Sequence, residues 1–278
     1  MKKLISVLLS LAMIAGLSMV PVSAADDPGI DPQTVFGEDE RYVVNAQKSP
    51  YISIGKMLIT YEGIPEKGAG TGFLISPTKF VTAGHCLMKE TKNGCHYATK
   101  IEIYFGMNSR YNYKYSTVVE CDSTNTFMPS EWEDEQKEEY DYGMLVLPEA
   151  MNTGYSFTLS TISSPSQKSV SIVGYQGEGY NDADDPNRND FSAYELLRGD
   201  GVISGSSTLS LKTQTDALGG QSGSPVLDAN NKVVGIFTYG APGRDENGEL
   251  LEHLPDGGSA RNRMTRITSS LIRFFNSH

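Results

Sequence analysis

The chain has 278 residues and a formal net charge of −11 at neutral pH. A protein that binds nucleic acid needs a basic surface to displace counterions, so this acidic balance excludes nucleic acid as an expected partner. The three cysteines allow at most one intrachain disulfide, with one thiol left over.

The first 24 residues have the layout of a secretory signal peptide. Two lysines give a positive start, an apolar run follows as far as Val20, and small residues at 22–24 offer a cleavage site. A retained membrane anchor is the alternative, but the run is short for a bilayer span and ends at Pro21. We therefore expect a secreted, extracellular protein with no membrane contact once residues 1–24 are removed.

From Tyr51 onward, short β-branched and aromatic runs alternate with Gly, Asn, Asp and Ser. Many short strands at this spacing, with almost no helical periodicity, are typical of antiparallel barrels or sandwiches. The length beyond the signal peptide suits one large β domain or two small lobes. The expected strands are 52–61, 72–75, 79–82, 101–105, 116–120, 143–147, 169–175, 209–213, 224–227 and 232–239.

Four segments depart from this pattern. Residues 268–275 combine a Thr-Ser-Ser cap with apolar residues on one side and predict a C-terminal helix. The stretches 131–139 and 181–190 are acidic, and the second could offer oxygen ligands to Ca²⁺. It lacks the spacing and glycine of an EF-hand loop, so a solvated loop is the favoured interpretation. The polar segment 240–259 reads as a surface insertion.

The cysteines are Cys86, Cys95 and Cys121. An exported chain makes one disulfide plausible. We predict a Cys95–Cys121 bond, because both residues flank an apparent strand–turn–strand unit while Cys86 sits beside an expected core residue.

The stretch Gly219-Gly220-Gln221-Ser222-Gly223-Ser224-Pro225 has the features of a nucleophile turn. A hydroxyl needs a base within hydrogen-bond reach to become a nucleophile. The oxyanion that forms needs donors already pointing at it, usually backbone N–H groups. We assign Ser222 as the nucleophile and the N–H groups of Gly220 and Ser222 as the oxyanion hole. An ordinary Gly/Ser-rich surface turn is the alternative.

The candidate base is His85. It follows the apolar strand 79–82 after two small residues, which is a good way to hold an imidazole at the lip of a cleft. His96 lies in a polar loop, His253 lies in the polar insertion, and His278 is the last residue.

The candidate orienting acid is Asp141. An imidazole base needs a buried carboxylate that fixes its tautomer and stabilises the imidazolium. Asp141 stands immediately ahead of the apolar strand 143–147, whereas the acids of 131–139 lie in a hydrophilic run. A simple turn residue is the alternative interpretation of Asp141.

Together these motifs resemble a known family. VTAGHC at 81–86, DYGMLVL at 141–147 and GGQSGSPV at 219–226 are similar to chymotrypsin-fold serine proteases, in the chain order His, Asp, Ser. Within that group the chain most resembles the secreted bacterial glutamyl endopeptidase branch, through 70–86, 35–41 and the C-terminal segment from Arg266.

This resemblance implies an all-β protein with two packed antiparallel six-stranded barrels and a C-terminal helix. The barrels would span roughly 51–150 and 165–265 of a protease domain at 35–278, after a short propeptide at 25–34. His85 and Asp141 would belong to the first barrel and Ser222 to the second. The reaction would be hydrolysis of polypeptide substrates through an acyl-enzyme. It also implies that Gly70 replaces the usual disulfide partner of Cys86.

The resemblance leaves the P1 preference open. Glutamate-specific members carry a threonine and a histidine where this chain has Ala217 and Phe237, and trypsin-like enzymes place a substrate-pairing acid at the position of Asp216. Acidic, basic and broad preferences therefore all stay possible. By resemblance, Tyr239 and Gly240 supply the strand edge that binds the substrate backbone, and we expect Thr238 to donate to Asp141.

We expect a serine endopeptidase, monomeric, that needs neither cofactor nor metal. The alternative from another class is a catalytically inactive binding module that keeps the same fold. A third possibility is an acyl hydrolase acting on small esters.

Overall fold

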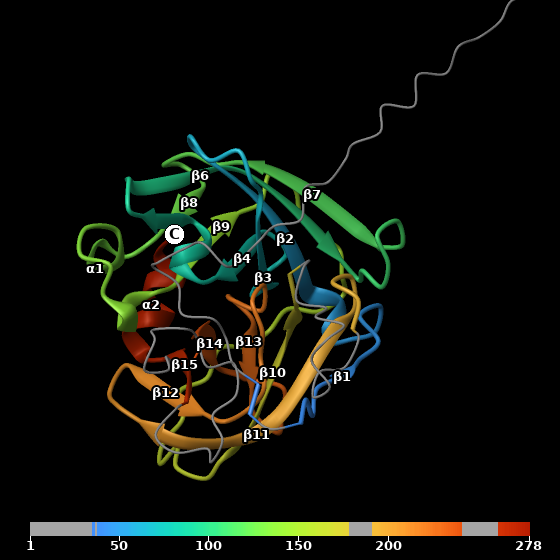
Figure 1. The fold of residues 1–278 in the computed structure, drawn as a ribbon, viewed down its shortest axis with the longest axis vertical. Coiled ribbons are helices and arrows are strands. Elements are labelled where there is room, and N and C mark those ends of the chain that lie inside the picture. The colour runs from blue at the N-terminus through green and yellow to red at the C-terminus, as the bar shows by residue number, and fades with distance from the viewer. Residues whose placement is uncertain (1–34, 37, 178–190, 241–260) are drawn as a thin grey trace, which may run out of the picture.

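The computed structural model describes residues 35–36, 38–177, 191–240 and 261–278. The expected signal peptide at 1–24, the propeptide at 25–34, the acidic loop at 181–190 and most of the 240–259 insertion lie outside the described residues. Within the described part, the chain forms two antiparallel sheets that pack against each other (Figure 1).

The first sheet has eight strands in the order β5-β6-β2-β3-β4-β9-β8, with β7 paired to β6, and it curls into a half-barrel. The expected strands at 79–82 and 143–147 form as β4 and β9, which pair directly. Its strands are β2 (Ile54–Tyr61), β3 (Gly68–Leu74), β4 (Lys79–Thr82), β5 (Met88–Thr91), β6 (Gly94–Phe105), β7 (Tyr115–Glu120), β8 (Thr126–Phe127) and β9 (Gly143–Val146).

The second sheet closes into a six-stranded barrel, because β11 pairs with both β10 and β12, and β1 adds to the outside of β11. Three of its strands, β1, β11 and β15, are missing from the strands expected from the sequence. Its strands are β1 (Tyr42–Val43), β10 (Ser169–Tyr175), β11 (Leu196–Ser206), β12 (Ser210–Thr213), β13 (Pro225–Leu227), β14 (Val233–Tyr239) and β15 (Asn262–Arg266).

The helices of the described residues are short, and the two sheets make up most of the fold. The expected C-terminal helix forms as α2 (Ser269–Ser277), and Thr268 caps it by accepting a hydrogen bond from the backbone N–H of Leu271 at 3.2 Å. Its buried Phe275 packs edge-to-face on Tyr142, which ties the end of the chain back to the first sheet. The other helices are α1 (Ser130–Glu133) and the 3₁₀ turns η2 (Tyr51–Ser53), η3 (Gly84–Cys86) and η4 (Glu138–Tyr140).

One hydrophobic core joins the two sheets. Phe73 and Val81 of the first sheet and Tyr175 and Ile236 of the second belong to a single buried cluster. Polar contacts cross the same boundary, since Thr71 accepts a hydrogen bond from the backbone N–H of Tyr175 at 3.0 Å. The two sheets are therefore held in a fixed relation, and side chains from both can build one site.

The predicted Cys95–Cys121 disulfide is wrong for this structure, in which all three cysteines are free. Register explains the error. Cys121 lies opposite Thr99, whose carbonyl accepts its N–H at 2.9 Å, and Cys95 is four residues further along β6. At about 3.4 Å per residue, the two cysteines are separated by about 14 Å along the strands, twice the reach of a disulfide. Gly70 does lie against Cys86, whose Sγ would be 2.9 Å from a Cβ at position 70.

Candidate active site

His85 lies in η3, directly after the end of β4, and is only 6% exposed. Gly84 lies against the indole of Trp132 and close to the Asp141 carboxylate. Any side chain at position 84 would collide with them, so this tight turn requires a glycine. The turn that carries the imidazole thus follows directly after β4.

Asp141 and His85 form a buried, doubly hydrogen-bonded pair. The carboxylate oxygen Oδ2 lies 2.7 Å from His85 Nδ1, and Oδ1 accepts the backbone N–H of His85 at 2.8 Å. Burial by itself lowers the pKa of His85, but the charge and hydrogen bond of Asp141 outweigh it, and the pKa lies well above the ordinary 6.5. This arrangement orients the ring and stabilises an imidazolium.

The Ser222 turn of the second sheet packs directly on the His85 segment. The carbonyl of Ser222 accepts the N–H of Thr71 at 2.8 Å, and the thiol of Cys86, the residue after His85, lies 3.9 Å from the same oxygen. Gly223 has φ +85°, and a Cβ there would collide with Thr71 and Thr82. The structure therefore brings the Ser222 turn against the chain segment that carries His85.

The backbone before Ser222 is shaped by Gly220, which has φ +91°. The carbonyl of Gly219 accepts the N–H of Gly177 at 2.7 Å, so the planar trans peptide turns the Gly220 N–H to the opposite side. Among the described residues that N–H has no hydrogen-bond partner. A donor held in this way can serve a developing oxyanion.

Asp216 is occupied by backbone amides of the N-terminal segment. Its carboxylate accepts the N–H of Phe36 at 2.8 Å and that of Glu40 at 2.9 Å. Burial raises the pKa of Asp216 to about 6, against the opposing effect of those two bonds. The side chains of Ala217 and Phe237 are fully buried in the core of the second barrel and present no polar atom.

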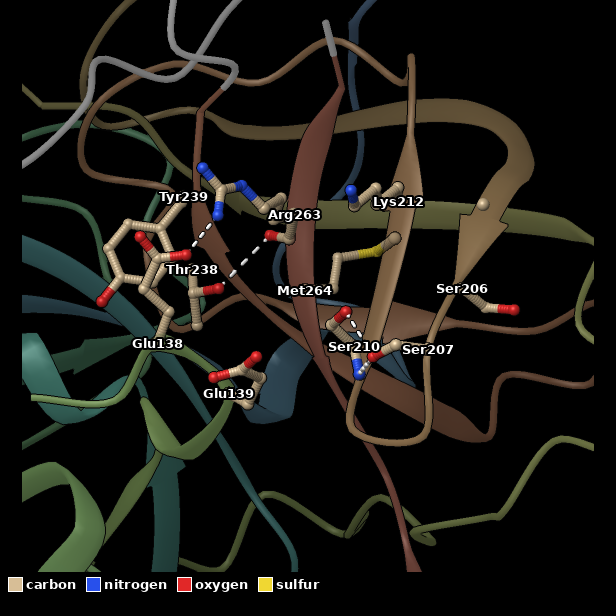
Figure 2. A pocket seen from close by; sticks show the side chains of 11 residues that line it. Glu138, Glu139, Ser206, Ser207, Ser210, Lys212, Thr238, Tyr239, Arg263 and Met264 are labelled. Carbon is tan, nitrogen blue, oxygen red and sulfur yellow. Dashed lines mark hydrogen bonds and ion pairs between the residues drawn. The ribbon is translucent and has the colours of Figure 1, made fainter. Parts of the chain in front are cut away.

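The residues that end β14 differ in part from expectation. Thr238 does not use its hydroxyl on Asp141 as expected; the hydroxyl donates to the carbonyl of Arg263 at 3.3 Å (Figure 2). Instead the ring of Tyr239 lies 5.7 Å from the His85 ring, tilted by 37°. Burial raises the pKa of the Tyr239 phenol, and the nearby Asp141 carboxylate raises it further. Gly240 is buried directly after β14, and its role with a substrate backbone stays a prediction.

The same part of the site opens into a hollow of about 490 Å³ between η4 and the second barrel (Figure 2). The ion pair between Arg263 and Glu138 lines it beside Tyr239. Ser207 and Ser210, whose hydroxyls are hydrogen-bonded to each other, line it further along the second barrel. Sequence reasoning missed this hollow, because its lining comes from segments that meet only in the folded chain.

Comparison with known proteins fits this geometry. Residues 70–236 match the family model described as "Trypsin-like peptidase domain". The chain belongs to the trypsin-like peptidase family. It is 32% identical over 246 residues to a protein named glutamyl endopeptidase from Bacillus licheniformis, covering 86% of this chain and 67% of that relative.

Two further proteins are similar to this trypsin-like peptidase. It is 27% identical over 252 residues to a protein named extracellular metalloprotease from Bacillus subtilis, covering 87% of this chain and 69% of the relative. A solved Glu endopeptidase structure superposes with a TM-score of 0.66 at 23% identity, covering 88% of this chain and 98% of that one. The predicted chymotrypsin fold and serine endopeptidase class are confirmed.

Sequence reasoning about this peptidase also missed a buried charge beside the Ser222 turn. Arg41 forms an ion pair with Asp39 and donates to Gln221, the residue before Ser222, at 2.8 Å. The two partners are 180 residues apart in sequence, and no local pattern signals their contact.

The described residues of this peptidase lack two features, a membrane-spanning helix and a metal-binding cluster. They contain no helix long and apolar enough to cross a membrane. They also contain no group of three or more His, Cys, Asp or Glu side chains placed to hold a metal ion.

Proposed function

We propose that this chain is a secreted serine endopeptidase in which His85, Asp141 and Ser222 act as a catalytic triad. The observation that carries the proposal is the buried His85–Asp141 pair, with Nδ1 and Oδ2 2.7 Å apart, at the turn that holds Ser222. A histidine oriented in this way leaves its Nε2 to act as the base.

The proposed reaction proceeds in two steps. Ser222 Oγ attacks the scissile carbonyl while His85 Nε2 takes the hydroxyl proton, and the oxyanion binds to the N–H groups of Gly220 and Ser222. The tetrahedral species collapses as His85 protonates the leaving amine. Water then attacks the acyl-enzyme with His85 again as base, which releases the acid and restores Ser222.

For the P1 residue we propose a preference for acidic side chains. The carboxylate of Asp216 accepts two backbone N–H groups and is 95% buried, so it is poorly placed to pair with a substrate lysine or arginine. The glutamyl endopeptidase that shares 32% identity points in the same direction. The histidine and threonine expected for a glutamate pocket are still absent, so the binding groups for the acid must differ from theirs.

The protease domain is proposed to cover 35–278, with a signal peptide at 1–24 and a propeptide at 25–34 that are removed during export. The mature enzyme is proposed to work as a monomer outside the cell on polypeptide substrates.

Expression of the full chain in a secreting bacterial host tests these statements. N-terminal sequencing of the protein in the medium reports where the leader ends, and light scattering reports its mass. Mass spectrometry of cleavage sites in a peptide library then reports P1, with Ser222→Ala as the matched control.

Each result of the library experiment has a meaning. Cleavage after Glu by the wild type alone supports the proposal in full. Cleavage after Lys or Arg by the wild type alone keeps the triad and overturns the acidic preference. If a correctly processed wild type cleaves nothing, the enzyme proposal is wrong and the inactive binding module takes its place.

A further inference from the structure

The segment ahead of β1 is attached to the loop 216–222 at two separate points. One is Asp216, which accepts the N–H groups of Phe36 and Glu40. The other is Arg41, which reaches Gln221 directly before the proposed nucleophile. The first contact holds the segment in place, and the second ends on the loop that the proposed chemistry uses.

Arg41 is buried, and each of its three guanidinium nitrogens donates a hydrogen bond. Its Nε and Nη2 donate to the two oxygens of Asp39 at 2.8 and 2.7 Å, and the side chains are 1% and 0% exposed. The third branch, Nη1, donates to Gln221 Oε1 at 2.8 Å. The planar guanidinium presents its donors in a rigid fork, so the bidentate pair with Asp39 fixes the direction of the third donor.

Gln221 uses the same oxygen to shape its own loop. Oε1 also accepts the backbone N–H of Leu218 at 2.9 Å, while the Gln221 backbone N–H donates to the Leu218 carbonyl at 3.0 Å. Because both partners of the side chain are donors, the oxygen must face them, and Nε2 is left buried without a partner among the described residues. The residues closed inside this loop are Gly219 and Gly220.

We propose that Arg41 is a positioning residue of the oxyanion hole. Through Gln221 it holds the 218–222 loop in the shape that presents the Gly220 and Ser222 amides to the reacting carbonyl. The inference rests on the proposed function, since it assigns a support to that same site. The competing explanation is a buried ion pair with Asp39 that contributes to folding alone.

Arg41→Lys is the variant that separates these explanations. Truncating Arg41 to alanine would leave the Asp39 carboxylate buried and unpaired. Lysine keeps the positive charge but lacks the planar guanidinium that can reach Asp39 and Gln221 at once. We expect kcat to fall by about 10- to 100-fold with KM changed little, because donor placement matters in the transition state. A matched control is Arg198→Lys, which also bridges an aspartate and a neutral acceptor, Asp200 and the Tyr51 hydroxyl, away from the loop.

A transition-state analogue gives a readout that a purely structural role would not move. A peptide boronate forms a tetrahedral adduct that uses the oxyanion hole, whereas the cleaved product peptide does not. In Arg41→Lys, the boronate affinity should weaken by about the same factor as kcat, with the product affinity unchanged. Equal weakening of both ligands would overturn the proposal.

A double-mutant cycle with Gln221→Met tests the route. Gln221→Met leaves the Asp39–Arg41 pair intact and removes the acceptor, so it carries the same prediction even if Arg41→Lys does not fold. If Arg41 acts through Gln221, the double variant should be no slower than the slower single variant. Additive losses, or a folded Arg41→Lys enzyme with kcat within twofold of wild type, would overturn the proposal. A wild type that does not react with a fluorophosphonate probe removes the proposed function itself, and this result is distinct from either of those.

Discussion

Both carboxylate oxygens of Asp141 are used by His85, one on the ring nitrogen Nδ1 at 2.7 Å and one on the backbone N–H at 2.8 Å. The acid therefore fixes the ring and the chain that carries it at the same time. Displacement of the Asp141 carboxylate would therefore release both the imidazole and the backbone of η3. The pair is the most tightly defined feature of the site.

In the proposed reaction, this pair sets the pH dependence of catalysis. Asp141 holds the pKa of His85 well above 6.5 despite burial, and only the neutral imidazole can accept the Ser222 proton. Activity should therefore rise with increasing pH as His85 loses its proton. We expect the midpoint of the acid limb of kcat/KM to lie above pH 6.5, measured with a neutral peptide substrate. A midpoint at or below pH 6 would contradict the role given to the carboxylate.

Replacing Asp141 should lower kcat and shift the pH–rate profile. In Asp141→Asn the negative charge is lost, so the pKa of His85 should fall and the acid limb should move to lower pH. The asparagine also fails to hold the productive tautomer, and kcat should drop by about 10⁴-fold. Circular dichroism and a pH–rate series check the prediction. A folded variant within tenfold of wild-type kcat would show that Asp141 is only structural.

Much of this site could be predicted from local sequence, because each proposed triad residue follows or precedes a short, distinctive run. The strand at 79–82 leads to His85, and the apolar strand at 143–147 follows Asp141, with both strands forming as expected. Strand β11 was missed because its glycines disguise a strand pattern. Gly199 and Gly201 are small because the backbone or side chains of Asp216 and Thr215 lie against them.

The rest of the site depends on contacts between distant segments. The side chain of Tyr239 was expected to serve only through its strand edge, but it lies against His85 and Asp141. Asp216 was considered as a substrate-binding acid, and its use by Phe36 and Glu40 cannot be read from a residue type. The Cys95–Cys121 disulfide prediction was wrong for a related reason, because the distance between two residues on paired strands depends on the strand register.

The Ser222 turn predicts a large cost for a small substitution at Gly223. This glycine has φ +85°, and an alanine Cβ would collide with Thr71 and Thr82 of the first sheet. We expect Gly223→Ala to lower the free energy of unfolding by at least about 2 kcal/mol and to reduce kcat strongly. Urea unfolding measures the first effect. The matched control is Gly154→Ala, which also has positive φ but nothing within 4 Å, and its loss should be clearly smaller.

The raised pKa of Asp216 predicts that the free energy of unfolding depends on pH. Its pKa is raised from 3.8 to about 6, so the folded protein holds this proton more tightly than the unfolded chain. The stabilisation is complete below pH 3.8 and is lost as pH rises through about 6, an effect of up to about 3 kcal/mol. Asp216→Asn cannot titrate. The free energy of unfolding of wild type minus variant should therefore fall between pH 4 and 6.5, and a constant difference would contradict the assignment.

The cysteines give a simple chemical test of the fold. With three free thiols, alkylation in denaturant without reductant should modify Cys86, Cys95 and Cys121. In the native protein, exposed Cys95 should react first, because Cys86 is buried. Reductant should leave the melting temperature unchanged. A Cys95–Cys121 linked peptide in a non-reduced digest would show that the register between β6 and β7 is wrong.

The central claim is that Ser222 becomes a nucleophile because His85 and Asp141 stand beside it. Labelling of the purified protein with a fluorophosphonate, followed by peptide mapping, tests this most directly. The account predicts a single phosphonylated residue, Ser222, with no labelling of His85→Ala or Ser222→Ala under the same conditions. An unlabelled wild type, or equal labelling of the His85→Ala variant, would contradict it.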